Sequence, residues 1–221
     1  MKAASEKQLA KKAEKKSEGK AKPEAAKIEA KAATAKKWKG KEWFIVLSPK
    51  IFGEKKIAET PCTDPKTLIN RNIEVSIADL IGQPTKYHMK VFFKITKIQD
   101  KSAFTRFNGY NILREYMMRF VRKHNQKVTL IENFNTKDGW QLQMTITSIM
   151  NRNTDTNIKR KMRLMTIDFM SKNLSKSTID DVLRNLIAGN LQKAIKKEGS
   201  KIYPVRFTEI EKIEVLNAAA A

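Results

Sequence analysis

The sequence predicts an α+β fold that follows a basic N-terminal arm. Residues 43–150 carry short aromatic and β-branched runs, several of which alternate apolar and polar residues as strands do. Residues 156–199 repeat apolar residues at helical spacing, and residues 201–215 return to an extended pattern. With 221 residues, of which 41% are hydrophobic, the chain can bury the core of one domain with an appendage.

The N-terminal arm is rich in Lys, Ala and Glu. Residues 1–42 contain fourteen Lys and six Glu, a net charge of +8, and their only aromatic residue is Trp38. This composition cannot offset chain entropy by burial, so we expect residues 1–37 to be disordered, with helix formation open in a bound state. A solubilising tail would have the same composition, but an arm that reaches along nucleic acid is favoured. We expect residues 38–216 to form a single α+β domain and residues 217–221 a short tail.

The first strands are predicted from four segments. Residues 43–47 form an aromatic and β-branched run, and residues 56–60 are a second candidate. Residues 72–77 alternate polar and apolar side chains, as a half-buried strand does. Residues 87–98 form a long strand with apolar residues on both faces. The sequence therefore predicts that these four segments are strands of one sheet.

The clearest β pattern lies within residues 128–150. Leu130 and Phe134 share one side of the first strand, and Asp138-Gly139 supplies a turn in which glycine tolerates positive φ. Apolar residues then occupy alternate positions at Trp140, Leu142, Met144 and Ile146. The pattern predicts a hairpin with one solvent-exposed face.

Four amphipathic helices are predicted. In residues 110–124 the apolar side chains gather on one half of the helical wheel and the arginines on the other. A second helix spans residues 157–174, a third residues 177–187, and a short fourth residues 191–197. The extended residues 201–215 have no sequential strand partner, so we expect them to pair with the earlier strands.

The sequence shows no pattern of catalytic or cofactor chemistry. None of the eight glycines forms a G-x-G pair or a P-loop, and Asp180-Asp181 suits the first turn of a helix. One cysteine, Cys62, and two histidines leave little for a His/Cys metal cluster. No run approaches the length of a bilayer span, and the first residues lack the apolar stretch of a signal peptide. We therefore expect no enzyme activity, cofactor, metal or membrane partner.

Positive charge is the main functional signal. The chain carries a net charge of +22, and +14 remains when residues 1–42 are removed, so the domain itself should bind a polyanion. Basic residues cluster in residues 114–123, 152–163 and 193–201. One cluster alone would equally be a solvated helix face, but three together favour nucleic-acid phosphates. From charge alone, the predicted RNA-binding residues are Lys37, Lys39, Lys41, Arg71, Arg106, Arg114, Arg119, Arg122, Lys123, Arg152, Lys159, Arg160, Lys161 and Arg163.

Five segments of the sequence form a recognisable series: KEWF at 41–44, NIEVSIADL at 72–80, FTRFNGY at 104–110, TKDGWQL at 136–142 and IYPV at 202–205. In the same order, they resemble segments of the S3Ae (eS1) family of archaeal and eukaryotic small-subunit ribosomal proteins. The resemblance covers about residues 38–216, and the short segment after Val215 is more typical of archaeal members.

The resemblance implies a β-barrel-like body with helices packed beside it, on the platform of the small subunit near the messenger RNA exit. It implies a cytoplasmic structural protein without catalytic activity. The implied partners are small-subunit ribosomal RNA, neighbouring ribosomal proteins and messenger RNA near the exit. Charge alone leaves a free RNA- or DNA-binding regulatory protein as the alternative, although this would not explain five ordered segments.

Overall fold

The computed structural model describes residues 40–218, and the chain divides into two units. The smaller unit joins residues 1–43 to residues 61–64, and its described part is residues 40–43 and 61–64. The larger unit comprises residues 44–60 and 65–221. The predicted arm, residues 1–37, lies outside the described residues.

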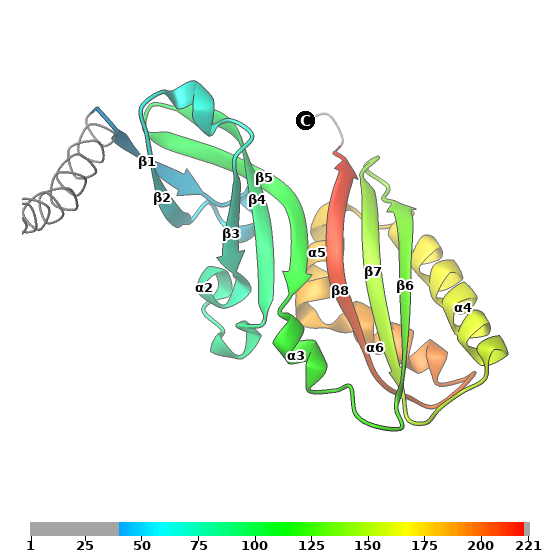
Figure 1. Cartoon of the computed structure of the whole chain (residues 1–221). Helices are drawn as coiled ribbons and strands as arrows, with labels where there is room; N and C mark the ends of the chain where they lie inside the picture. The colour runs from blue at the N-terminus through cyan, green and yellow to red at the C-terminus, as the bar shows by residue number, and fades with distance from the viewer. Residues whose placement is uncertain (1–39, 219–221) are drawn as a thin grey trace, which may run out of the picture. The chain divides into compact units, whose positions relative to one another are not determined.

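The fold is mixed α+β, with one eight-stranded sheet that contains parallel and antiparallel pairs (Figure 1). The main path of the sheet runs through β2 (Lys56–Cys62), β1 (Glu42–Leu47), β5 (Ser102–Ile112), β8 (Val205–Asn217), β7 (Gln141–Met150) and β6 (Gln126–Asn135). β4 (Met89–Gln99) pairs with β5, and β3 (Asn72–Ser76) pairs with β4. The hairpin predicted within residues 128–150 is confirmed as β6 and β7.

β5 holds the two parts of the sheet together. β4 follows one edge of β5 along its whole length. On the other edge, β1 pairs with residues 102–104 and β8 pairs with residues 109–111. At Gly109, where β8 crosses, a Cβ atom would lie 2.9 Å from the Ile213 carbonyl oxygen. Glycine therefore permits the close approach of β5 and β8.

β8 brings the C-terminal segment back to the sheet, as the sequence predicts. It pairs antiparallel with β7 from Val205 to Asn217, and with β5 near its own end. The strand begins at Val205 rather than at residue 201, because the N–H groups of Ile202 and Tyr203 still donate to the Gly199 carbonyl. The structure thus has the last strand in the middle of the sheet.

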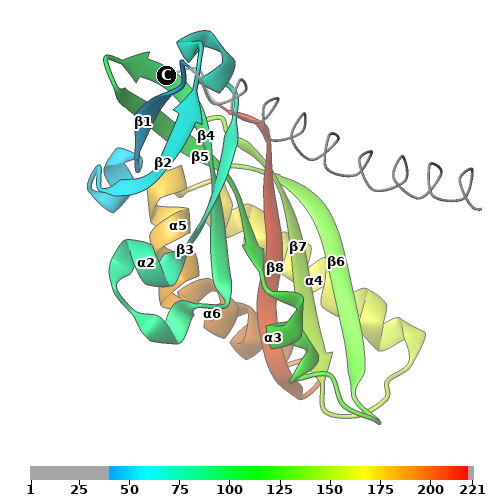
Figure 2. The same cartoon turned by 60° about the vertical axis from the view of Figure 1, so that its left-hand side comes forward.

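Three helices cover one face of β6, β7 and β8 (Figures 1 and 2). They are α4 (Thr156–Leu174), α5 (Ile179–Ala188) and α6 (Asn190–Gly199). Their inward side chains join those of the sheet in one apolar core that includes Met144, Ile146, Met170, Leu186, Ile195 and Ile210. The turn of the β6–β7 hairpin fixes the start of α5, because the Asp138 carboxylate accepts a hydrogen bond from the Ile179 N–H at 2.9 Å.

Short elements connect the strands. They are η1 (Lys50–Phe52), η2 (Pro65–Leu68), α2 (Ile77–Ile81), η3 (Pro84–Lys86) and α3 (Arg114–Met118). Within residues 40–218, no helix has the length and apolar character needed to cross a membrane.

The helix predicted over residues 110–124 is wrong over much of that range. Residues 102–112 form β5, and α3 covers Arg114–Met118 alone. Tyr110 and Ile112 are buried strand residues that pair with Val91 and Met89 of β4. These long-range pairings override the local helical pattern, because β structure depends on cross-strand packing more than on propensity. Residues 119–125 then lead into β6.

The sheet is open, so the barrel-like body implied by the resemblance is not the arrangement observed in residues 40–218. β2, β3 and β6 are outer strands that each pair with one neighbour. The outer strand β6 is bordered by α4, whose Arg163 Nε donates to the Thr129 carbonyl at 3.2 Å. The Arg163 side chain of α4 thus contacts the backbone of this outer strand.

Candidate nucleic-acid interface

The start of β6, the end of β7 and the start of β8 lie next to one another in the sheet. β6 begins at Gln126, which pairs with Met150 at the end of β7, and Met150 pairs with Val205 at the start of β8. The Asn151 N–H donates to the Pro204 carbonyl at 3.3 Å. The segments before β6, after β7 and before β8 therefore lie side by side.

Basic side chains gather on these segments. We define the basic end of the sheet by Arg122, Lys123, Arg152, Lys201 and Arg206, all of which are exposed. Arg122, Lys123 and Arg152 are among the predicted binding residues. Arg206 was missed by sequence reasoning because it stands alone in an alternating strand, and only the pairing of β8 brings it to the cluster.

Two contacts fix the loop that precedes β6. In the orientation that satisfies both groups of the Asn125 amide, Nδ2 donates to the Asn151 carbonyl at 3.0 Å and Oδ1 accepts from Arg206 Nη1 at 3.2 Å. At the other end of the loop, Phe120 stacks on Phe207 with ring centroids 3.7 Å apart. The loop is thus attached to β8 at both ends, which positions its basic side chains.

The first half of α4 continues the basic end. Lys159 and Arg160 lie on the same side of the helix as Arg163, because they precede it by four and three residues, and Lys161 lies further around. The opposite side is fixed by Met162, which is fully buried and packs against β6, β7 and β8. This packing and the hydrogen bond from Arg163 to β6 hold the cationic face of α4 in place.

The last turn of α6 meets the same region. At Gly199 a Cβ atom would lie 2.8 Å from Met162 Cε of α4, so the two helices are in close contact. Two acidic residues also occur here: Lys201 Nζ pairs with Glu198 Oε2 at 2.8 Å, and Asp155 is the N-cap residue of α4. The three basic clusters predicted from the sequence thus contribute to one surface, with positive charge in excess.

Other predicted binding residues are not part of this surface. Lys37 and Lys39 lie outside the described residues, and Lys41 belongs to the smaller unit. Arg71 Nη1 donates a hydrogen bond to Thr60 Oγ1 of β2 at 2.6 Å. Arg106 is exposed on β5, in the part of the sheet formed with β4.

α3 carries two further predicted residues away from the basic end. Arg114 begins the helix and lines a groove beside it. Arg119 follows the helix near His88, whose ring stacks on Tyr116 with centroids 3.7 Å apart. Burial lowers the pKa of His88, and the Arg119 charge lowers this pKa further, while a hydrogen bond with the Thr85 backbone acts in the opposite direction.

The structure holds one strongly perturbed acid, and it lies in the core rather than at the basic end. Burial raises the pKa of Glu209 on β8 to about 7, although a hydrogen bond from Gln192 Nε2 at 2.8 Å favours the carboxylate. Burial, followed by the nearby Glu209 carboxylate, raises the pKa of Tyr110. In the described part of the chain, no three His, Cys, Asp or Glu side chains could hold a metal ion together.

Most of the chain matches one known protein family. The model of the Ribosomal S3Ae family matches residues 29–219. The chain belongs to the Ribosomal S3Ae family. This confirms the resemblance carried by the five ordered segments.

Archaeal relatives agree with membership in the S3Ae family. The small ribosomal subunit protein eS1 of Desulfurococcus amylolyticus is 34% identical over 185 residues, which cover 84% of this chain and 87% of the relative. The protein of the same name from Staphylothermus marinus is 32% identical over 186 residues, or 84% of this chain and 88% of the relative. That of Sulfurisphaera tokodaii is 30% identical over 193 residues, or 87% of this chain and 100% of the relative.

As an S3Ae protein, the chain is a cytoplasmic ribosomal protein of the small subunit with a structural role in translation. It is not an enzyme. Its partners are ribosomal RNA and other ribosomal proteins.

Proposed function

We propose that this chain binds small-subunit ribosomal RNA through the basic end and the adjoining face of α4. The convergence of separate basic segments is the observation that supports this most directly. Arg122 precedes β6, Arg152 follows β7 and Arg206 lies near the start of β8, and the pairing of these three strand ends brings them together. Arginine and lysine side chains neutralise phosphates and release counterions, which is the sequence-independent part of RNA binding.

Preorganisation of the surface supports the same proposal. Phe120 stacks on Phe207, and Met162 is fully buried against the sheet, so the backbone that carries the basic residues is fixed before RNA arrives. Side chains whose backbone is already fixed lose less conformational entropy on binding than side chains that must first be ordered. The domain, residues 38–216, should therefore provide the main RNA contacts, and residues 1–37 additional, salt-sensitive ones.

We further propose that the chain lies on the platform of the small subunit near the messenger RNA exit, with messenger RNA as a further partner there. The family resemblance supports this location, and the exposed arginines of the basic end suit contacts with RNA bases as well as phosphates. A free RNA- or DNA-binding regulatory protein is the alternative, and membership in a ribosomal protein family favours the ribosomal role.

The test compares two variants that each lose four positive charges. In the first, Arg122, Lys123, Arg152 and Arg206 are replaced by Gln. In the matched control, the exposed residues Lys66, Lys97, Lys137 and Lys176, which lie outside the basic end, are replaced by Gln.

Affinity for purified small-subunit ribosomal RNA is measured by filter binding across a range of salt concentrations. The affinity falls as salt rises, and each phosphate contact contributes about −0.7 to −0.9 to the slope of log affinity against log salt. The slope of the first variant should therefore be shallower than that of the wild type by about 3. The control should keep the slope of the wild type. Circular dichroism checks that both variants are folded. Equal losses in both variants would contradict the proposed surface, and a wild-type chain that fails to sediment with small subunits would favour the regulatory alternative.

A further inference from the structure

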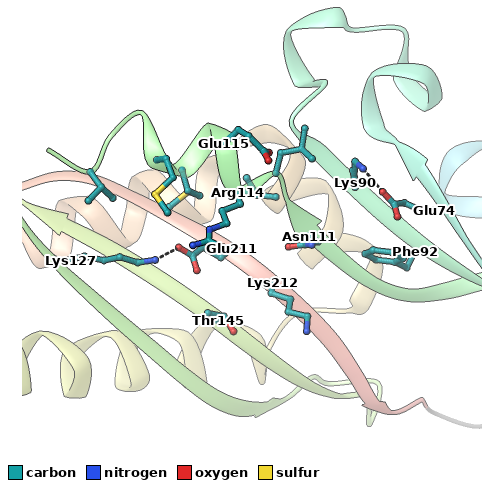
Figure 3. A pocket seen from close by; sticks show the side chains of 15 residues that line it. Glu74, Lys90, Phe92, Asn111, Arg114, Glu115, Lys127, Thr145, Glu211 and Lys212 are labelled. Atoms are coloured by element: carbon teal, nitrogen blue, oxygen red, sulfur yellow. Dashed lines mark hydrogen bonds and ion pairs between the residues drawn. The ribbon is translucent and has the colours of Figure 1, made fainter.

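A groove of about 680 Å³ opens beside α3, on the face of the sheet opposite α4, α5 and α6 (Figure 3). Side chains from β3, β4 and the end of β5 line one part of the groove, and side chains from α3, β6, β7 and β8 line the rest. It lies on the opposite side of β6 from α4 and is distinct from the basic end.

The groove carries little net charge, because four basic and three acidic side chains line it, although the chain as a whole carries +22. Each of its three lysines pairs with an acid: Lys90 pairs with Glu74, Lys127 Nζ lies 2.7 Å from Glu211 Oε1, and Lys212 Nζ lies 2.6 Å from Glu214 Oε1. Figure 3 shows the first two of these pairs along the groove. A polyanion binds where cations release counterions, so a groove whose three lysines are already paired with acids is less suited to RNA phosphates than the basic end.

The groove is also apolar at its α3 border. The side chains of Met118 and Val121 are 52% and 36% exposed, and both line the groove. Phe92 of β4 is half-buried at the opposite part of the lining. Exposed large apolar side chains that gather at a concave site mark interaction surfaces, and methionine adapts to partners of different shape.

Two uncharged polar side chains of the groove have no hydrogen-bond partner within residues 40–218. The Asn111 amide and the Thr145 hydroxyl line the groove, and neither makes a hydrogen bond with a described residue. A side-chain amide can donate to and accept from a peptide group, as a peptide backbone requires. A small net charge, exposed apolar side chains and unpaired uncharged polar groups together suit the binding of a polypeptide segment.

We propose that this groove binds a segment of a neighbouring small-subunit protein. Apolar side chains of that segment would pack against Met118 and Val121, and its backbone would hydrogen-bond with Asn111 and Thr145. The inference rests on the proposed function, because such a neighbour is present only in the small subunit. The molecule then has two opposed interaction surfaces: RNA contacts the basic end and the α4 face, and protein contacts the groove.

The test uses photo-crosslinking from two positions of equal exposure. Met118 in the groove and Leu164 on the cationic helix α4 are each 52% exposed. Each is replaced, in a separate full-length chain, by an amino acid with a diazirine side chain, which inserts into protein or RNA. The chains are assembled into small subunits and irradiated, and the crosslinked partners are identified by mass spectrometry.

The probe at position 118 should crosslink to a peptide of another ribosomal protein, and the probe at position 164 to ribosomal RNA. Crosslinks from position 118 to RNA, to residues 1–39 of the same chain, or to no partner would overturn the groove proposal. If the unmodified chain did not enter the subunits, the proposed function itself would fail. The two failures are therefore distinguishable.

A substitution without a change of charge gives an independent readout. Met118→Gln should leave the affinity of the free chain for ribosomal RNA unchanged. Its release from assembled subunits during a salt wash should be about tenfold faster, the effect expected when one packed interface side chain loses its contact. Release at the wild-type rate would count against the groove as a protein-binding site.

Discussion

Glu209 shows how a single buried charge affects the whole fold. Burial raises the pKa of its carboxyl group from the usual 4.5 to about 7. The Gln192 amide donates one hydrogen bond to it, but this does not replace the water that an exposed carboxylate would bind. The Tyr110 hydroxyl, which is also buried, has no hydrogen-bond partner among the described residues. Ionisation of Glu209 therefore opposes folding.

The first prediction concerns the pH dependence of stability. Because the folded-state pKa of Glu209 lies above that of the unfolded chain, the folded state holds the proton more tightly between pH 4.5 and about 7. Its contribution to the free energy of unfolding should fall across this window as pH rises, by about 3 kcal/mol in total. Glu209→Gln should remove this contribution and make the protein more stable at pH 8.

Urea unfolding at pH 5 and pH 8 measures the effect. Glu214→Gln, at an exposed position of the same strand, is the control and should keep the pH dependence of the wild type. An unchanged pH dependence in Glu209→Gln would show that another group is responsible.

Individual binding residues were predictable from the sequence only as exposed charges. Charge alone marked Arg122, Arg152 and Arg160 as candidate binding residues, and all three are exposed. That these residues lie close together was not predictable, because it depends on the pairing of Met150 with Val205, which are far apart in the sequence. For the same reason, Arg206 had no signal in the sequence. The positions of the basic residues in the small subunit remain a prediction.

At the scale of elements, periodicity worked where each segment had one clear period. Alternation predicted β6 and β7, and helical spacing predicted α4, α5 and α6. It failed at both ends of the helix predicted over residues 110–124, because residues 110–112 belong to β5 and residues 119–124 follow α3. Tyr110 and Ile112 fit a strand pattern and also begin a helical one. Contacts with β4 and β8 decide the outcome there, and these contacts are not local.

The second prediction concerns the junction of β5 and β8. In Gly109→Ala, the new Cβ would lie 2.9 Å from the Ile213 carbonyl oxygen, and backbone on both sides resists movement. We expect a loss of about 1–3 kcal/mol in the free energy of unfolding, as for other overpacked sites. Urea denaturation measures this loss.

Gly199→Ala is the matched control for this prediction. Its Cβ would lie 2.8 Å from Met162 Cε, the flexible end of a side chain that can move aside. Alanine also favours the last turn of α6 over glycine. Gly199→Ala should therefore be much less destabilising than Gly109→Ala, and the reverse order would contradict the role of the β5–β8 contact.

At the scale of the whole molecule, charge is divided between the arm and the domain. Residues 1–42 carry +8 with one aromatic residue, and the rest of the chain carries +14. Contacts from the arm should be nonspecific, individually weak and sensitive to salt. In the domain, packing against the sheet holds the backbone of the basic segments in place.

The third prediction follows from this division. A chain without residues 1–37 should fold, bind small-subunit ribosomal RNA with a shallower salt dependence, and enter reconstituted subunits. The variant with Gln at Arg122, Lys123, Arg152 and Arg206 should enter them less well. Circular dichroism and the fraction incorporated are the two measurements. The division would be reversed if loss of the arm abolished incorporation while the Gln variant assembled normally.

The central place of β8 also sets the order of events during synthesis. β8 pairs with both β5 and β7, yet it follows every other strand along the chain. While residues 205–217 are still inside the ribosome that makes them, the emerging chain exposes unpaired edges of β5 and β7, and Arg206 has not reached its place. We expect the nascent chain to depend on protection from aggregation until β8 emerges. Incomplete chains would lack the assembled RNA-binding surface, so completion of synthesis would act as a checkpoint for entry into the subunit.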